Sequence, residues 1–268
     1  MHRIICKRTK AKESRSGMHQ LKAHQRIIRE QRAVEAGQPS QIKTGDQITF
    51  GFNFPTPDDM KIKDAEVRPC TFNQARSVIM EYEWLGSMAQ RTTHTFALWV
   101  GDNDIAGVVC FAIPPTPQAA EGVAGKENAH LVKTLARGAC VWWAHPHSAS
   151  KLIAGAIKLM AETSSFRYFV AYSDYRAGEI GTVYQATNWL YTGTTAGDTE
   201  YLIEGEWKSG RTARHKSYVR RGIDYKTLPS RRGNKKHRYV YIAGSRRERK
   251  ELTKALKYKI ADYPKREM

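Results

Sequence analysis

The spacing of apolar residues changes several times along the middle of the chain, and each change predicts a new element. From Asn73 to Leu85 apolar residues recur every three or four positions, which predicts a helix capped by Thr71 and ended by Gly86. The apolar runs THTFALWV and IAGVVCFAI flank four polar residues and predict a β-hairpin. The segment PPTPQAAEGVAGKENA, rich in Pro and Gly, predicts a loop after the hairpin.

The centre of the sequence alternates strands with helices. The run LVKTLARGACVWW predicts a strand, HPHSAS a turn, KLIAGAIKLMAET a helix, and RYFVAYSD another strand. A short helix over residues 179–187, a strand over 189–194 and a strand in EYLIEGEW continue the series. This order is typical of an α/β domain with parallel strands at its centre and antiparallel strands beside them. We therefore predict an α/β (α+β) fold with a mixed central sheet flanked by helices.

Weaker patterns lie toward the two ends. A helix from His19 to Ala36 is polar nearly all round, so it needs a partner to be stable. The pattern QITFGFNF predicts a short strand or ordered loop, and a charged strand follows it and ends at Cys70. Near the C-terminus RYVYIAG predicts a strand, and a helix begins at Ser245, where Glu248 completes a capping box.

Charge divides the chain into three blocks. Residues 1–33 hold ten Lys and Arg against two acids, residues 34–206 thirteen against nineteen, and residues 207–268 twenty-one against five. Cations concentrated at both ends are typical of a protein with a polyanionic partner, and nucleic acid is the leading one. We predict a basic N-terminal arm over 1–43, a catalytic domain over 44–206, and a basic C-terminal extension over 207–268 that contacts DNA. The alternative is that the basic ends serve only solubility.

Composition excludes several classes of protein. With 41% hydrophobic and 10% aromatic residues the chain is neither collagen-like nor wholly disordered. No apolar run approaches the ~18 residues of a membrane span, and the N-terminus has no signal-peptide core. Four cysteines, far apart and without a CxxC pair, fit neither a zinc ribbon nor a disulfide scaffold. We expect a cytoplasmic protein with no membrane partner.

The order of predicted elements resembles the GNAT superfamily of CoA-dependent N-acyltransferases. Within it, the stretches LARGACVWWAHPHSASKLIAGAI and FVAYSDYRAGEIGTVYQATNWLYTG resemble the Mom DNA-modification proteins of bacteriophages. The resemblance covers about residues 66 to 206 and implies a GNAT-like fold. It also implies a transferase that places a carbamoylmethyl group on the exocyclic N6 amine of adenine in phage DNA, in the host cytoplasm, and so protects that DNA from restriction.

The resemblance implies roles for three residues. Asp174 and Tyr184, ten residues apart, look like the paired Asp and Tyr important in Mom proteins, and Arg137 looks like an Arg of that family. A carboxylate at a strand end can accept the N6 proton or bind the amino edge of adenine, and a phenol can protonate a departing thiolate. The alternatives are that Asp174 is a turn or helix-capping residue, and that Tyr184 has a buried ring with a solvated hydroxyl.

The CoA-binding loop of GNAT enzymes has no direct counterpart here. Where those enzymes carry Arg/Gln-x-x-Gly-x-Gly/Ala, this chain has residues 145–151, HPHSASK, without glycine. A helix beginning near Ser148 still offers free N–H groups and a positive dipole end, to which Ser150 and Lys151 add. We expect these three residues, with Arg137, to bind acetyl-CoA or a related acyl donor. The alternative is a serine that only caps the helix.

Other polar and aromatic residues allow fewer conclusions. At the end of the first helix Glu83 could face a cleft and Trp84 could stack on a base, so both are candidate substrate-binding residues; a Trp there is more often part of the core. His145 and His147 at a turn lack the spacing of metal ligands, so we predict no metal-binding residue, although the chemistry leaves metal dependence open.

Three functions remain in competition. The first is a DNA adenine-modifying enzyme that flips its target base out of the duplex. The second is a GNAT N-acyltransferase whose acceptor is a hypermodified base, an RNA or a protein amine. The third is a non-enzymatic nucleic-acid-binding protein on a degenerate GNAT fold. Double-stranded DNA is the expected partner, and the sequence leaves the oligomeric state open, a homodimer included.

Overall fold

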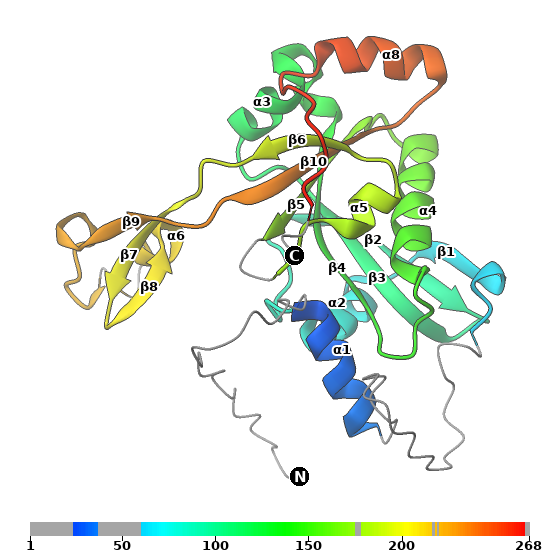
Figure 1. Ribbon diagram of the computed structural model, residues 1–268, viewed down its shortest axis with the longest axis horizontal. Coiled ribbons are helices and arrows are strands. Elements are labelled where there is room, and N and C mark those ends of the chain that lie inside the picture. The colour runs from blue at the N-terminus through cyan, green and yellow to red at the C-terminus, as the bar shows by residue number, and fades with distance from the viewer. Residues whose placement is uncertain (1–23, 37–59, 175–177, 216–217, 219, 266–268) are drawn as a thin grey trace.

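A large twisted sheet forms the body of the molecule, and a small sheet extends away from it (Figure 1). The computed structural model describes residues 24–36, 60–174, 178–215, 218 and 220–265. The strands of the large sheet are β1 (Ala65–Pro69), β2 (Thr92–Val100), β3 (Asp104–Ala112), β4 (Val132–Cys140), β5 (Tyr168–Asp174), β6 (Leu190–Thr194) and β10 (Lys236–Ile242). Their order is β1-β2-β3-β4-β5-β10-β6. Only β4 and β5 pair in parallel within this sheet; the other pairs are antiparallel.

Helices cover both faces of this sheet. They are α1 (His24–Glu35), α2 (Phe72–Tyr82), α3 (Pro117–Asn128), α4 (Ser148–Thr163), α5 (Thr182–Ala186) and α8 (Arg246–Ala255). Alternate residues of β5 face opposite sides: Phe169 belongs to the core cluster under α4, whereas Tyr168 belongs to the cluster under α3 and α8. The predicted α/β class, with a mixed central sheet flanked by helices, is confirmed.

The small sheet stands at the end of two extended connections. It contains β7 (Thr199–Ile203), β8 (Glu206–Ser209) and β9 (Ser230–Arg232) in the order β8-β7-β9, with the short helix α6 (Gly210–Ala213) beside them. We call residues 199–232 the arm, and residues 195–198 and 233–236 the neck. Figure 1 shows the arm reaching out to the left of the body.

Most of the predicted elements are present. The helix after Thr71 has the full capping box, with Gln74 at its third position, and Ser245 and Glu248 form the second. The two apolar runs form the antiparallel pair β2 and β3. The pattern QITFGFNF and most of the basic N-terminal segment predicted over 1–43 lie outside the described residues. Of the helix predicted from His19 to Ala36, the structure describes the part that contains α1.

The loop prediction for PPTPQAAEGVAGKENA was wrong, because most of this segment forms α3. Thr116 caps the helix by accepting a hydrogen bond from the Ala119 amide, and Pro117 stands at the first helical position, where its missing N–H costs nothing. Gly125 adopts a left-handed conformation (φ 78°) that interrupts the helical geometry near its end. Pro and Gly therefore mark the start and the kink of a helix here.

The domain boundary predicted between residues 206 and 207 falls after the first residue of β8, inside the arm. The segment beyond it divides between both sheets, because β8 and β9 belong to the arm and β10 lies between β5 and β6 in the body. Of the helices in the described part of the chain, none is long and apolar enough to cross a membrane.

Candidate functional site

A cleft opens where the two parallel strands of the body separate. The strands β4 and β5 pair only from Val132 to Thr134, although β4 continues to Cys140 and β5 to Asp174. A cavity of about 1590 Å³ occupies the divergence, and residues 135–140 line one wall. Because β3 takes only one edge of β4, the other edge presents backbone N–H and C=O groups to this cavity.

Three carboxyl groups gather in the wall of the cavity. Glu83 follows α2, Asp174 ends β5, and Glu179 lies between β5 and α5. Burial, together with the charges of Glu83 and Asp174, raises the pKa of Glu179 to about 7. Burial also raises the pKa of Glu83, a shift that the Arg137 charge opposes. The cluster therefore holds a carboxyl group that gains and loses a proton near neutral pH.

Two cations partly balance these acids. The Nε of Arg137 lies 3.9 Å from Oε2 of Glu83 and donates a hydrogen bond of 2.8 Å to the Ser87 carbonyl. The Nζ of Lys236, in the neck, lies 3.7 Å from Oδ2 of Asp174, its direct register partner across β10 and β5. Each cation thus forms an ion pair with one carboxyl group of the cluster.

The phenol of Tyr184 completes the group. Its ring packs at 5.0 Å from Trp189 and 5.3 Å from Tyr239, while the side chain still lines the cavity. Burial is the largest cause, and the Glu179 charge the next, of a strongly raised Tyr184 pKa. The phenol therefore remains protonated at neutral pH and can donate a hydrogen bond.

A model of the Mom protein family matches residues 64–265, which include both walls of the cavity and the arm. The chain belongs to this family. Membership of the Mom protein family, predicted from two stretches of the sequence, is confirmed.

Solved acetyltransferases share parts of the fold of this Mom family member. A Bacillus subtilis acetyltransferase in complex with CoA is 9% identical, covering 67% of this chain and 99% of its own, with a TM-score of 0.39. The Vibrio fischeri ribosomal-protein-S5-alanine acetyltransferase is 10% identical, with coverages of 73% and 97% and a TM-score of 0.40. Arabidopsis thaliana NAA60 in complex with acetyl-CoA is 12% identical, with coverages of 66% and 98% and a TM-score of 0.40. A search of curated proteins found no match.

The predicted site residues of this Mom family member fall into two groups. Asp174, Tyr184, Glu83 and Trp84 all line the cavity, and so does Arg137, which approaches Glu83. The sequence placed Arg137 with the donor-binding turn, whereas the structure pairs it with the carboxyl cluster. The catalytic and substrate-binding roles of these residues stay predictions.

The predicted donor-binding residues at α4 are separated in space. Ser150 lines the cavity, and its Oγ donates to the His147 carbonyl at 3.0 Å. Ser148 is fully buried, with its Oγ 3.8 Å from the Met60 sulfur. The Lys151 ammonium points to the backbone instead, where it donates to the Ile62 carbonyl at 2.6 Å. Neither Ser148 nor Lys151 lines the cavity, so the first turn of α4 faces it mainly through residues 149 and 150.

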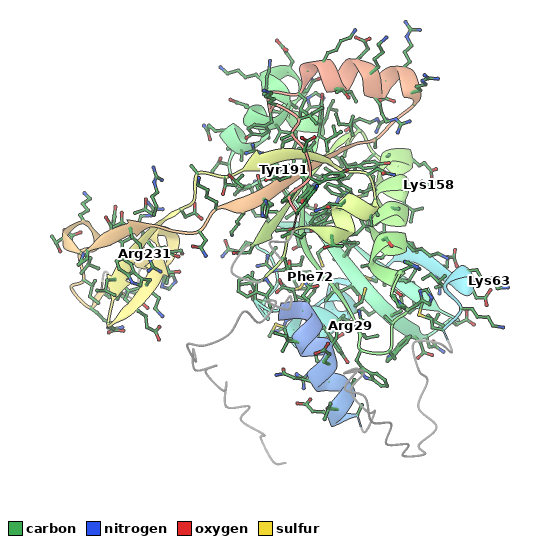
Figure 2. The ribbon with its side chains drawn as sticks, viewed as in Figure 1. Arg29, Lys63, Phe72, Lys158, Tyr191 and Arg231 are labelled. Atoms are coloured by element: carbon green, nitrogen blue, oxygen red, sulfur yellow. The ribbon has the colours of Figure 1, made fainter. Side chains whose placement is uncertain are left out.

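Helix α1 closes part of the cavity mouth. The Gln25 amide donates to the Gly138 carbonyl at 2.9 Å, on the open edge of β4. The Arg29 guanidinium, seen on α1 in Figure 2, donates to the carbonyls of Ala144 at 2.8 Å and Trp142 at 3.3 Å. The helix that is polar nearly all round therefore docks through side-chain hydrogen bonds to backbone carbonyls.

Sequence reasoning missed Glu179, Lys236 and the α1 contacts. Glu179 carried one local signal, since it is a carboxyl group five residues after Asp174 in a short turn. Lys236 carried none, because it reaches Asp174 only through the pairing of β10 with β5. Among the described residues, no group of three His, Cys, Asp or Glu is placed to hold a metal ion.

Proposed function

We propose that this Mom family member is a DNA-modifying transferase. It transfers an acyl group from acetyl-CoA or a related acyl donor, with the thiol as leaving group, or a carbamoylmethyl group from a donor that already carries it, to the N6 amine of adenine, which loses a proton. The modification protects the DNA from restriction. The observation that carries this proposal is the meeting of Asp174, Glu179 and Tyr184 in one wall of the cleft between β4 and β5. Family membership supports the proposal.

The carboxyl cluster suits a weakly nucleophilic amine. The lone pair of adenine N6 is delocalised into the ring, so N6 has to lose a proton as its new bond forms. Asp174, beside the Lys236 ammonium, accepts a hydrogen bond from the amino group and orients it. Glu179, with a pKa of about 7, is matched to accept the proton at neutral pH.

The β4 side of the cavity suits the donor. The edge of β4 over residues 135–140 is not paired with another strand, and an extended ligand with amide groups can pair there once it displaces the Gln25 side chain from the Gly138 carbonyl. The N-terminal turn of α4, with Ser150, presents the positive end of the helix to phosphate. Tyr184 then protonates the leaving group as the bond to the transferred carbon breaks.

The test is mass spectrometry of nucleosides from plasmid DNA of a bacterial host that expresses the protein. We expect a new adenosine adduct with the wild type, its loss with Asp174→Ala, and a strong decrease with Tyr184→Phe and Glu179→Gln. Glu162→Gln, which changes an exposed carboxyl on α4, is the matched control and keeps full modification.

Unmodified DNA from a folded, well-expressed protein contradicts this proposal. A new adduct in RNA, on a prior base modification or on protein amines would then identify the acceptor instead. If DNA, RNA and protein all stay unmodified while nucleic acid is bound, the protein is a binding protein on an inactive transferase fold.

A further inference from the structure

Two basic surfaces project from the body. The arm carries nine Lys and Arg against four acids, and residues 244–265, which contain α8, carry eight against three. Their net charges are equal, so charge alone does not decide which surface meets a polyanion. Figure 1 shows them apart, with α8 over α3 and the arm extending away from the sheet.

Position relative to the cavity separates the two surfaces. Thr195, Ala196, Gly197 and Asp198 on one side of the neck, and Asn234 and Lys236 on the other, line the cavity. Among the described residues, none between 244 and 265 does so. A ligand that follows the arm toward the body therefore arrives beside the carboxyl cluster.

The two connections of the neck are hydrogen-bonded to each other. The Gly233 amide donates to the Asp198 carbonyl at 2.6 Å, and the Thr195 amide donates to the Lys236 carbonyl at 2.9 Å. Gly197 adopts φ 79°, and a Cβ there would collide with the Gly233 carbonyl oxygen, so the two connections touch closely. Lys236 then joins the neck to Asp174 through its ammonium.

The outer surface of the arm presents cations in an ordered setting. All three residues of β9, an edge strand of the small sheet, are exposed. Arg231 lies 4.3 Å above the Trp207 ring and 3.0 Å from the nearly buried Glu200 carboxylate, and Figure 2 shows it on the arm. Arg220, Lys226 and Arg232 are further exposed cations of the arm. Charges of this kind bind phosphates at positions set by the protein.

We propose that the arm is a docking surface for the phosphate backbone of duplex DNA and leads the duplex to the cavity. The inference rests on the proposed function, because that function makes DNA the acceptor. A base is one unit of a long polyanion, and the rest of that polymer has to lie outside a cavity of this size. The arm supplies the external contacts, which are independent of base sequence.

The test compares DNA binding by the full chain and two matched variants. Fluorescence anisotropy with a labelled 24-base-pair duplex is measured between 50 and 300 mM NaCl. The arm variant is Arg220→Gln/Lys226→Gln/Arg232→Gln, and the control is Arg247→Gln/Arg249→Gln/Lys250→Gln on α8. The slope of log K against log salt is negative, and each lost phosphate contact reduces its magnitude by about 0.9. For the arm variant we expect the magnitude of this slope to decrease by about 2 to 3 and the affinity to fall at least about tenfold. For the control we expect less than half of that decrease in the magnitude of the slope.

Each other outcome overturns the docking proposal. It fails if the arm variant binds like the wild type, if both variants lose equal affinity, or if the wild type does not bind the duplex. Tighter, arm-dependent binding of an RNA duplex of equal length would assign the surface to RNA. Equal unfolding temperatures of the three proteins exclude a loss of folding as the cause.

Nucleoside mass spectrometry separates this proposal from the proposed function. Arm-dependent binding together with unmodified DNA leaves the docking surface in place and removes the assigned reaction. Modified DNA together with an arm variant that binds normally removes only the docking surface.

Discussion

At the scale of single residues, the most unusual group is the Glu179 carboxyl. A carboxyl that loses its hydration and faces two other carboxyl groups ionises only at a higher pH, which is why its pKa rises from 4.5 to about 7. The folded state therefore holds this proton more tightly than the unfolded chain does. Ionisation of Glu179 above that pKa lowers the stability of the fold.

Replacing Glu179 with Gln tests this cost. A raised carboxyl pKa means that stability is lost as the pH rises from about 4.5 to about 7, and a neutral amide removes the loss. We expect Glu179→Gln to gain up to about 3 kcal/mol over the wild type at pH 8 and much less at pH 5, measured by urea unfolding. Glu162→Gln serves as the exposed control. A gain that is the same at both pH values would contradict the assigned pKa.

At the scale of elements, the position of Tyr184 depends on the start of α5. Gly181 precedes this helix with φ 73°, and a Cβ there would collide with the Tyr239 ring and lie 2.9 Å from Ser173 Oγ. Glycine is needed at this point for the backbone conformation and for the close approach to β10 and β5. These contacts stabilise α5 more than the hydrogen bonds within its five residues do, because so short a helix is marginal on its own.

The substitution Gly181→Ala is therefore expected to move α5. Backbone strain of about 1 kcal/mol and overpacking of about 1 to 3 kcal/mol add together in the free energy of unfolding. Gly193→Ala in β6 is the matched control, since that glycine has φ 81° and open space around it, so only the strain remains. Thermal unfolding measures both. Equal losses in the two variants would show that Tyr239 and Ser173 yield without cost.

Elements with a strong local pattern were predictable, and those defined by contacts were not. Thr71 and Ser245 mark helix starts in the sequence because a capping side chain bonds within its own first turn. The segment that became α3 contains Pro and Gly, and its apolar residues Ala120 and Val123 pack beneath α8 across a long sequence separation. The position of β10 between β5 and β6 was not predictable either, because it also depends on contacts across a long sequence separation and no local pattern assigns it.

At the scale of the whole molecule, the sequence showed the separation of charge, and its resemblance to Mom proteins predicted joint roles for Asp174 and Tyr184. It did not reveal that one basic segment would supply Lys236 to the acidic cluster, because that contact depends on the pairing of β10 with β5. The arm and the cavity therefore meet at the neck. The proposed function needs an acidic cluster for an amine and a basic surface for phosphates, two requirements that one uniform surface charge does not satisfy.

The arm and the body have separate cores, which predicts that the body folds without the arm. Both core clusters of the body omit every residue between 192 and 238. The neck brings Thr195 and Lys236 together, and the Lys236 amide donates to Thr195 Oγ1 at 3.0 Å. An Asn-Gly turn that replaces the residues between them can therefore join β6 to β10 as a two-residue hairpin.

We expect this shortened chain to keep the near-ultraviolet circular dichroism of the wild type and one cooperative thermal transition. Duplex binding by the shortened chain should fall to the level of the arm variant or below it, because all the arm cations are absent. A shortened chain that aggregates or unfolds without cooperativity would instead show that the arm stabilises the body through the neck.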